Sequence, residues 1–195
     1  RVRSSNTHDL LVFTNQCQVY KCKVAAFEDT KSAQLGSYLP TDLEMDADET
    51  VTWVIDPEDY KADVLFVFEN GRVARVALSG YATKTNRKRL KNAIYGGSKL
   101  MYATVLKEER DLALVSSDFR LVNFNTSLLK TKTTNSTQGV QALTIKGSRT
   151  VTMVGTAEEF IGGKAQVEKF RTEKLPSAGA PMKETDMKSL FDLEE

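Results

Sequence analysis

The stretch DVLFVFENGRVARVAL, residues 63–78, decides the fold, because the chain repeats its pattern twice more. The other copies are DLLVFTNQCQVYKCKV at residues 9–24 and DLALVSSDFRLVNFNT at residues 111–126, and the three align without a gap. The copies begin 54 and then 48 residues apart. Repeats of this length are typical of architectures in which similar units stack on their neighbours.

Each copy predicts a β-hairpin. An apolar run comes first, a short polar turn follows, and a run of alternating apolar and polar residues comes last. In the middle copy the turn is Glu69–Asn70–Gly71, and both Asn70 and Gly71 tolerate the positive φ of tight hairpin turns. Cys17 occupies the position of Gly71 in the first copy. The same pattern therefore predicts a hairpin in all three repeats.

A further β-rich run follows each hairpin after a polar stretch. These runs are TVTWVI at 50–55, LMYATVL at 100–106 and TVTMV at 150–154. Three or four short strands in a unit of about fifty residues are the pattern of propeller blades, and one blade alone cannot bury both faces. We therefore expect an all-β region over residues 1–155, with repeats at about 9–60, 61–107 and 108–155.

Residues 156–195 form a C-terminal extension of different character. VEKFRTEKL, residues 167–175, predicts either a strand that completes a blade or a short helix. Residues 176–181 have proline at both ends and are typical of a loop or linker. Residues 187–195 form a small amphipathic tail with an acidic end, which either packs on the blades or extends from them.

Composition narrows the class of protein. A chain of 195 residues with 41% hydrophobic residues can bury one sizeable core. No stretch is apolar for long enough to span a bilayer, and no charged and then apolar leader opens the chain, so we expect no membrane partner. The first residue is Arg1 rather than Met, which favours a fragment of a longer protein. Two cysteines indicate reduced, cytosolic thiols rather than a disulfide framework.

Nothing in the sequence predicts catalysis, a metal site or a cofactor. His8 is the only histidine, which excludes a histidine-based triad or a histidine-rich zinc site. The acidic run DLEMDADE, residues 42–49, has Ala47 where a calcium-binding EF-hand loop needs glycine, so we expect a solvated acidic turn. Cys17 and Cys22 fall in turn and core positions of the repeat and are expected to be structural.

Charge is distributed unevenly along the chain. Residues 9–60 carry three basic and eleven acidic side chains, a net charge of −8. Residues 61–107 carry ten basic and two acidic side chains, a net charge of +8, and residues 108–155 carry six and four, a net charge of +2. The near-neutral total therefore conceals a basic middle repeat.

The densest basic segment is KTNRKRLK, residues 84–91, in the loop between the middle hairpin and its third strand. The matching loop of the third repeat is rich in threonine and serine. Arginine, lysine, serine and threonine are the usual donors to phosphate oxygens, although a charge run can also be only a solvated loop. The predicted phosphate-binding residues are Lys84, Arg87, Lys88, Arg89 and Lys91 in the basic loop, Arg72, Arg75 and Arg120 in the hairpins, and Lys130 and Lys132 in the third repeat.

The three repeats resemble the C-terminal domain of bacterial type IIA topoisomerase A subunits, the family to which the A subunits of DNA gyrase and topoisomerase IV belong. LLVFTNQCQVYKCKV and VLFVFENGRVARVAL carry the resemblance best, and the third copy is looser at residues 116–120. The resemblance covers residues 10–155, about three blades.

The resemblance implies a β-pinwheel, a propeller-like disc whose neighbouring blades exchange strands and around whose basic rim duplex DNA bends. Its blades would have four short strands each, in an open arc of three or four blades or in a disc whose other blades precede Arg1. It also implies a bacterial, cytoplasmic and nucleoid-associated parent enzyme that changes DNA topology with ATP. The implied partners are the N-terminal breakage-reunion region of the same polypeptide, which holds the catalytic tyrosine, and a separate ATPase subunit.

One family motif is absent. The gyrase proteins carry a Gln-Arg-Arg-Gly-Gly-Lys-Gly-like box for wrapping DNA, and Gly162–Lys164 is the nearest fragment here. This favours the topoisomerase IV type, unless the box precedes Arg1. A competing interpretation is a propeller-like platform for protein partners that does not bind DNA. The balanced total charge and the acidic first repeat favour that platform, whereas the basic segment 84–91 argues against it.

Overall fold

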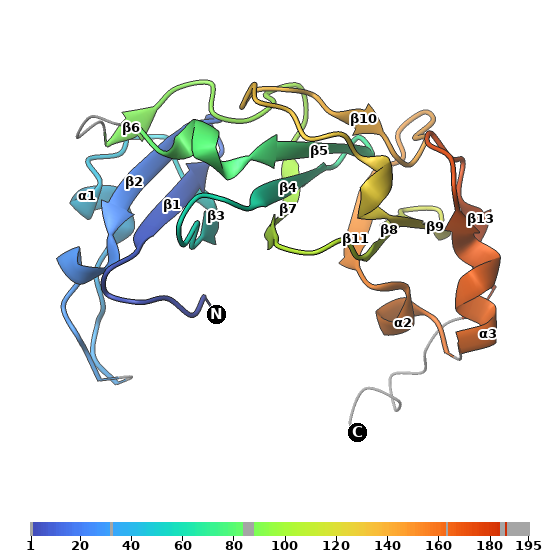
Figure 1. The fold of residues 1–195 in the computed structure, drawn as a ribbon, viewed down its shortest axis with the longest axis horizontal. Coiled ribbons are helices and arrows are strands. Elements are labelled where there is room, and N and C mark those ends of the chain that lie inside the picture. Colours follow the sequence, from blue (N-terminus) through green and yellow to red (C-terminus); the bar gives the residue numbers. More distant parts are fainter. Residues whose placement is uncertain (1, 32, 84–87, 163, 184–185, 187–195) are drawn as a thin grey trace.

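The computed structural model describes residues 2–31, 33–83, 88–162, 164–183 and 186, and shows three small β-sheets placed side by side in an arc (Figure 1). Each sheet is one blade. This arrangement confirms the predicted all-β, propeller-like fold. The arc is open, since the first and third blades lie at opposite ends of the row.

Each repeat supplies an antiparallel hairpin and a third strand that pairs with the first strand of that hairpin. In chain order these are β1 (Asp9–Thr14), β2 (Val19–Lys23) and β3 (Val51–Ile55); β4 (Asp63–Phe68), β5 (Arg72–Ala77) and β7 (Leu100–Leu106); and β8 (Asp111–Ser116), β9 (Arg120–Asn125) and β11 (Val151–Gly155). The pairing with the third strand shifts register at the same place in every blade, next to the last residue of the first strand. Nearly all of these bounds follow the predicted runs.

The fourth strand of the first two blades comes from the following repeat. β6 (Arg89–Leu90) pairs with β2, and β10 (Val140–Gln141) pairs with β5, so the sheet orders are β3-β1-β2-β6 and β10-β5-β4-β7. The expectation of a plain loop at 84–91 is therefore wrong for Arg89 and Leu90. A two-residue strand is too short to show periodicity, and it forms because β2 otherwise leaves an unpaired edge.

The C-terminal extension completes the third blade. β12 (Arg171–Thr172) pairs in parallel with β9, and β13 (Ala180–Pro181) pairs antiparallel with the same strand. Both predictions for residues 167–175 hold in part, because a helical segment leads directly into the strand. The helical turns here are α2 (Ala157–Phe160), α3 (Lys164–Val167) and η4 (Glu168–Phe170). The predicted tail at 187–195 lies outside the described residues.

The core lies between the blades. Along β4, Val64, Phe66 and Phe68 pack toward the first blade. Leu65 and Val67 pack toward the third blade. The middle strand is apolar without interruption because successive side chains point to opposite faces and both faces are covered. A third cluster packs the far face of the third blade against the extension, through Ile161, Phe170 and their neighbours.

Two glycines fit places where a side chain would collide. Gly71 has φ 80°, and a Cβ there would lie 2.1 Å from the carbonyl oxygen of Leu143. Gly139 has φ 67°, and its Cβ would lie 2.0 Å from the carbonyl oxygen of Val73 where β10 joins β5. Cys17 and Phe119, at φ 57° and 56°, take the place of Gly71 in the other hairpin turns, which confirms the alignment of the copies.

The remaining helical elements are single turns. They are η1 (Val24–Ala26), η2 (Leu78–Tyr81) and η3 (Thr126–Leu128), which follow the three hairpins, and α1 (Leu39–Asp42) in the first repeat. None of the helices in the described part of the chain is long and apolar enough to cross a membrane.

The acidic run 42–49 is not wholly solvated, which corrects the expectation for its last residue. Glu49 is 4% exposed, and its carboxylate accepts hydrogen bonds from the hydroxyls of Thr14 and Tyr20, the latter at 2.6 Å. The backbone N–H of Asp46 donates to the same carboxylate at 3.2 Å. A buried carboxylate needs such donors, and here they fix the acidic turn against the first blade.

Candidate nucleic-acid interface

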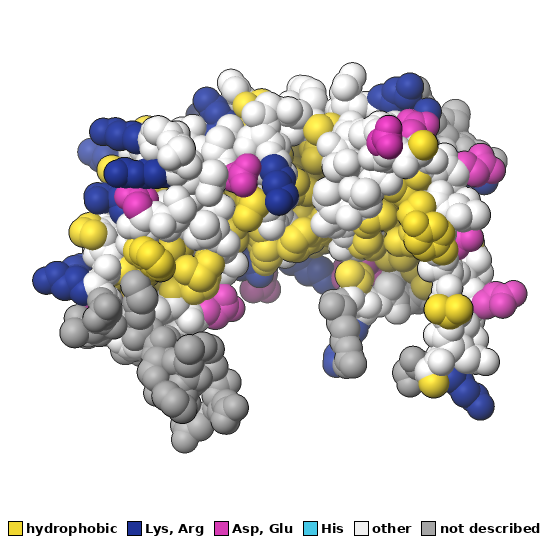
Figure 2. Space-filling model, turned by 180° about the vertical axis from the view of Figure 1, so that it is seen from behind, with side chains coloured by type: hydrophobic (Ala, Val, Ile, Leu, Met, Phe, Trp, Pro, Cys, Tyr) yellow, Lys and Arg dark blue, Asp and Glu magenta, His cyan; other side chains and the backbone are white. Residues whose placement is uncertain are grey.

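The exchanged strands form the convex margin of the arc, and exposed lysines accompany them. β6 and β10 lie along this margin in Figure 1. Lys88 and Lys91 flank β6, and Lys130 and Lys132 precede β10, and all four are exposed. Figure 2 shows lysine and arginine side chains toward both ends of the upper margin, with acidic side chains beside them at one end, and hydrophobic side chains in a band across the middle of this face. We call these four lysines the margin lysines.

Strand exchange changes which blade carries the basic segment. Because β6 belongs to the first sheet, Lys88, Arg89 and Lys91 lie at the edge of the acidic first blade, although they come from the basic middle repeat. Likewise, the backbone of Lys132 forms an isolated parallel β-bridge with Val76 of the second blade. The predicted residues Lys84 and Arg87 lie outside the described part of the chain.

Arg89 is held by the first blade. Its Nη1 lies 3.2 Å from Asp46 Oδ1 and donates to the Tyr20 hydroxyl at 3.3 Å. The guanidinium carbon also lies 5.9 Å from the centroid of the Tyr20 ring. Hydrogen bonds from Gln18 and Arg89 hold the pKa of Asp46 below its ordinary value. Arg89 therefore has an internal anionic partner.

Arg75 lies in a network that joins two repeats. Its Nε lies 2.6 Å from Asp63 Oδ2, and its Nη1 lies 2.7 Å from Glu109 Oε1. The same nitrogen donates at 3.4 Å to the carbonyl oxygens of Thr126 and Leu129. The side chain is only 16% exposed. The geometry shows a connection between the second and third repeats, and phosphate contact by Arg75 stays a prediction.

The other two hairpin arginines also reach segments that lie later in the chain. Arg72 donates to the carbonyl of Gly139 at 3.4 Å, beside β10. Arg120 donates to the carbonyls of Ala178 and Gly179 at 2.8 and 2.6 Å, beside β13. We call Arg72, Arg75 and Arg120 the linking arginines, because each forms hydrogen bonds from its hairpin to a segment that completes or follows its blade. Their predicted contact with DNA is likewise untested.

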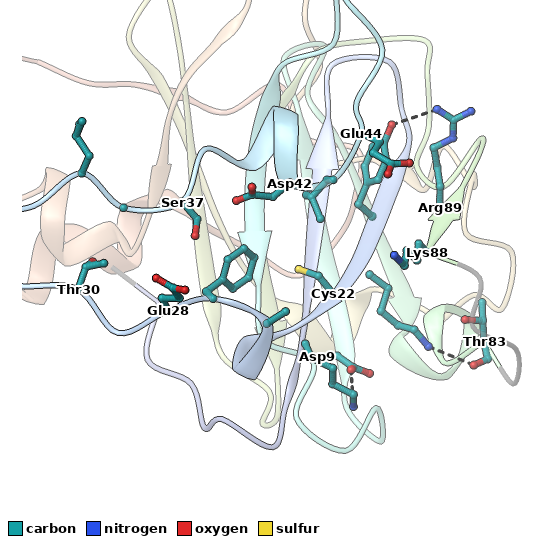
Figure 3. A pocket seen from close by; sticks show the side chains of 18 residues that line it. Asp9, Cys22, Glu28, Thr30, Ser37, Asp42, Glu44, Thr83, Lys88 and Arg89 are labelled. Carbon is teal, nitrogen blue, oxygen red and sulfur yellow. Dashed lines mark hydrogen bonds and ion pairs between the residues drawn. The ribbon is translucent and has the colours of Figure 1, made fainter.

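A wide hollow of about 1260 Å³ lies beside the first blade, between β2, β6 and residues 26–30 and 35–44 (Figure 3). Cys22 lines it, and burial together with the charge of Asp9 raises the pKa of that thiol to about 11. A thiol with this pKa is not a nucleophile near neutral pH. Within the described residues, no three histidine, cysteine or acidic side chains are grouped to hold a metal ion.

The sequence is similar to DNA gyrase A proteins. It is 24% identical to the one from Staphylococcus aureus (strain NCTC 8325 / PS 47) over 145 residues, which are 72% of this chain and 16% of that protein. It is 22% identical to the one from Escherichia coli (strain K12) over 158 residues, 79% of this chain and 18% of that protein. The chain thus spans less than a fifth of the curated relatives it matches. No protein-family model matches it.

Solved structures of the same kind share the architecture. The C-terminal domain of DNA topoisomerase IV has a TM-score of 0.69 at 21% identity, over 82% of this chain and 51% of that one. The DNA gyrase A C-terminal domain has a TM-score of 0.61 at 14% identity, over 94% of this chain and 64% of that one. The E. coli ParC C-terminal domain has a TM-score of 0.73 at 15% identity, over 95% of this chain and 80% of that one. The chain has the β-pinwheel fold of these domains.

The aspartate that opens each copy was used in the sequence analysis only to align the repeats and was assigned no role. Asp9 pairs with Lys23 at 2.7 Å, Asp63 pairs with Arg75, and Asp111 accepts from Asn125 at 2.8 Å. These residues share one position, so the repeat itself was the available signal. Lys146 and Arg149, in the turn before β11, were also not proposed as phosphate contacts, although both are exposed. Arg149 Nη1 lies 3.2 Å from Asp118 Oδ2, so this arginine forms an ion pair within the third blade.

Proposed function

We propose that this chain binds duplex DNA along its convex margin, without sequence preference, and bends it. The single observation that carries the proposal is the placement of exposed lysines beside the exchanged strands of two neighbouring blades. Successive blades then offer positive charge along one margin. Lysine side chains neutralise phosphates and position the duplex, but they carry no base readout by themselves.

The short helices support the proposed lack of sequence preference. Every helix in the described part of the pinwheel has four residues or fewer. A recognition helix that enters the major groove is longer than this. Contacts along a curved margin favour bending through backbone neutralisation and DNA deformability instead.

The wider role rests on similarity. We propose that the pinwheel is the C-terminal domain of a type IIA topoisomerase, in the polypeptide that corresponds to gyrase A or its topoisomerase IV counterpart. In that role it would hold DNA beside a breakage-reunion region that carries the chemistry, with the ATPase on a separate polypeptide, in the bacterial cytoplasm at the nucleoid. No residue of this chain is proposed as catalytic, and no cofactor is proposed for it. Its similarity to gyrase A sequences and to both kinds of C-terminal domain supports this role.

A platform for protein partners is the second candidate. The acidic turn of the first blade and the engaged state of the linking arginines favour it, since both reduce the positive charge that is available to DNA. A platform would bind DNA weakly or not at all.

The test uses fluorescence anisotropy with a labelled linear duplex and a double variant, Lys88→Ala with Lys130→Ala, that removes one margin lysine from each of two blades. The matched control is Lys61→Ala with Lys107→Ala, which changes net charge equally at exposed lysines paired with Asp59 and Glu58 away from the exchanged strands. We expect the margin variant to bind more weakly and to lose about 2 from the magnitude of the salt slope, and the control to resemble wild type. Equal losses in both variants would contradict a margin site.

A further inference from the structure

The acidic turn of the first blade faces the basic edge that strand exchange brings to it. Asp46 forms an ion pair with Arg89 at 3.2 Å, although the two residues come from different repeats. The charge of Lys91 also acts on Asp46. Lys88 and Arg89 lie on the same side of the hollow in Figure 3. The first blade thus places the Asp46 carboxylate against one part of the margin.

Asp46 is held in position rather than left to move with its turn. Its backbone N–H donates to the buried Glu49 carboxylate, and its carbonyl accepts the N–H of Glu49 at 3.0 Å. Its side chain accepts from Gln18 Nε2 at 3.3 Å and from Nη1 of Arg89 in β6 at 3.2 Å. Arg89 is fixed from the other side by the ring and hydroxyl of Tyr20.

A phosphate oxygen and a carboxylate oxygen compete for the same guanidinium geometry. We propose that Asp46 is an internal competitor of DNA phosphate for Arg89, and that it sets how strongly the first blade takes part in DNA binding. The inference rests on the proposed function and concerns the same margin. The margin lysines engage phosphates directly, whereas a phosphate at Arg89 Nη1 competes with the Asp46 carboxylate for that nitrogen.

The strength of the pair suits a competitor. The Arg89 and Asp46 side chains are 32% and 53% exposed, so solvent screens their attraction and DNA can replace the partner. Displacement leaves Asp46 without its cation, which offsets the gain from the phosphate contact. Removing the carboxylate charge therefore strengthens DNA binding and adds about one phosphate contact to the salt dependence.

The test compares DNA affinity and salt slope for wild type, Asp46→Asn and the control Asp59→Asn. The first substitution keeps an oxygen that accepts from Gln18. The control changes net charge equally at an exposed aspartate whose partner is Lys61. We expect Asp46→Asn to bind the duplex roughly two- to fivefold more tightly, with a slope steeper by about 0.9, and Asp59→Asn to match wild type. Adding Arg89→Gln to Asp46→Asn should remove the gain, with thermal melting to confirm that each variant is folded.

The outcomes separate the two proposals. If wild type binds DNA and Asp46→Asn binds no more tightly, only the competitor is overturned. If both aspartate variants tighten binding equally, general charge explains the effect and the competitor is again overturned. If none of the proteins binds at low salt, the DNA-binding function fails and the competitor fails with it. Binding that appears only in Asp46→Asn would support the competitor.

Discussion

Arg75 Nε and Asp63 Oδ2 lie 2.6 Å apart across the hairpin of the middle blade, and the same guanidinium contacts Glu109 of the next repeat. One side chain therefore joins a cross-strand pair to the following blade. Because the arginine is largely buried, removing it takes one donor from Asp63, which also accepts from the Thr131 hydroxyl at 2.6 Å, and one donor from each of two backbone carbonyls. Such losses are costly in partly buried networks.

We expect Arg75→Gln to lower the free energy of unfolding by roughly 2 kcal/mol. Urea denaturation followed by circular dichroism measures this change. The control Lys61→Gln removes a surface ion pair with Asp59 and should change stability little. A loss in Arg75→Gln no larger than in the control would mean that the network does not stabilise the blade pair.

Gly139 permits β10 to lie against β5, and a glycine elsewhere in the chain offers a matched control. Gly139→Ala places a Cβ 2.0 Å from the carbonyl oxygen of Val73, whereas Gly147→Ala, at a similar φ of 63°, has no atom within 4 Å of its Cβ. Both substitutions incur the cost of positive φ, about 1 kcal/mol, but only the first also collides. Denaturation should show a clearly larger loss for Gly139→Ala, and equal losses would contradict the close approach.

Acid should weaken the first blade through Asp9. Burial opposes ionisation of this carboxyl, but hydrogen bonds from Lys23 and Tyr60 outweigh it, so its pKa lies below the ordinary 3.8. A group with a depressed folded pKa contributes stability above its unfolded pKa, and this contribution is lost as pH falls through the folded value. Stability should therefore fall as pH drops below about 4, and less steeply in Asp9→Asn. Unfolding free energies measured between about pH 6 and 2 would test this, with Asp29→Asn, an exposed aspartate, as the control.

The extension is a structural part of the third blade. Phe170 is 3% exposed within the cluster that covers this blade, so Phe170→Ala should cost about 3 to 4 kcal/mol. Leu128→Ala removes a side chain that is 38% exposed and should cost far less. Calorimetric unfolding would show the difference. Similar melting temperatures for the two variants would indicate that the extension does not stabilise the arc.

Repeats and apolar runs predicted most of the fold, because burial on both faces leaves a strong pattern in β4 and β8. The exchanged strands were not predicted from the residues, since two-residue strands such as β6 have no period. The family resemblance predicted that neighbouring blades exchange strands, but it did not indicate that Arg89 would lie beside Asp46. Positions distant in sequence come together only once the sheet order is known.

The candidate site was predicted in part for the same reason. Charge counting identified Lys88, Lys91, Lys130 and Lys132, and the structure places these side chains on the surface. Charge counting could not distinguish these lysines from the linking arginines. In the sequence, an arginine that bonds to another repeat looks the same as one that is exposed to solvent. Partners such as the carbonyls of Ala178 and Gly179 exist only in the folded chain.

The most direct test of DNA binding along the margin is the affinity of the wild-type chain for a linear duplex across a series of salt concentrations. If about four or five phosphates are neutralised, log K should fall linearly with log salt at a slope of about −4. Affinity should not depend on the base sequence of the duplex. Absence of binding at the lowest salt concentration, or a slope near zero, would contradict the account and favour the protein platform.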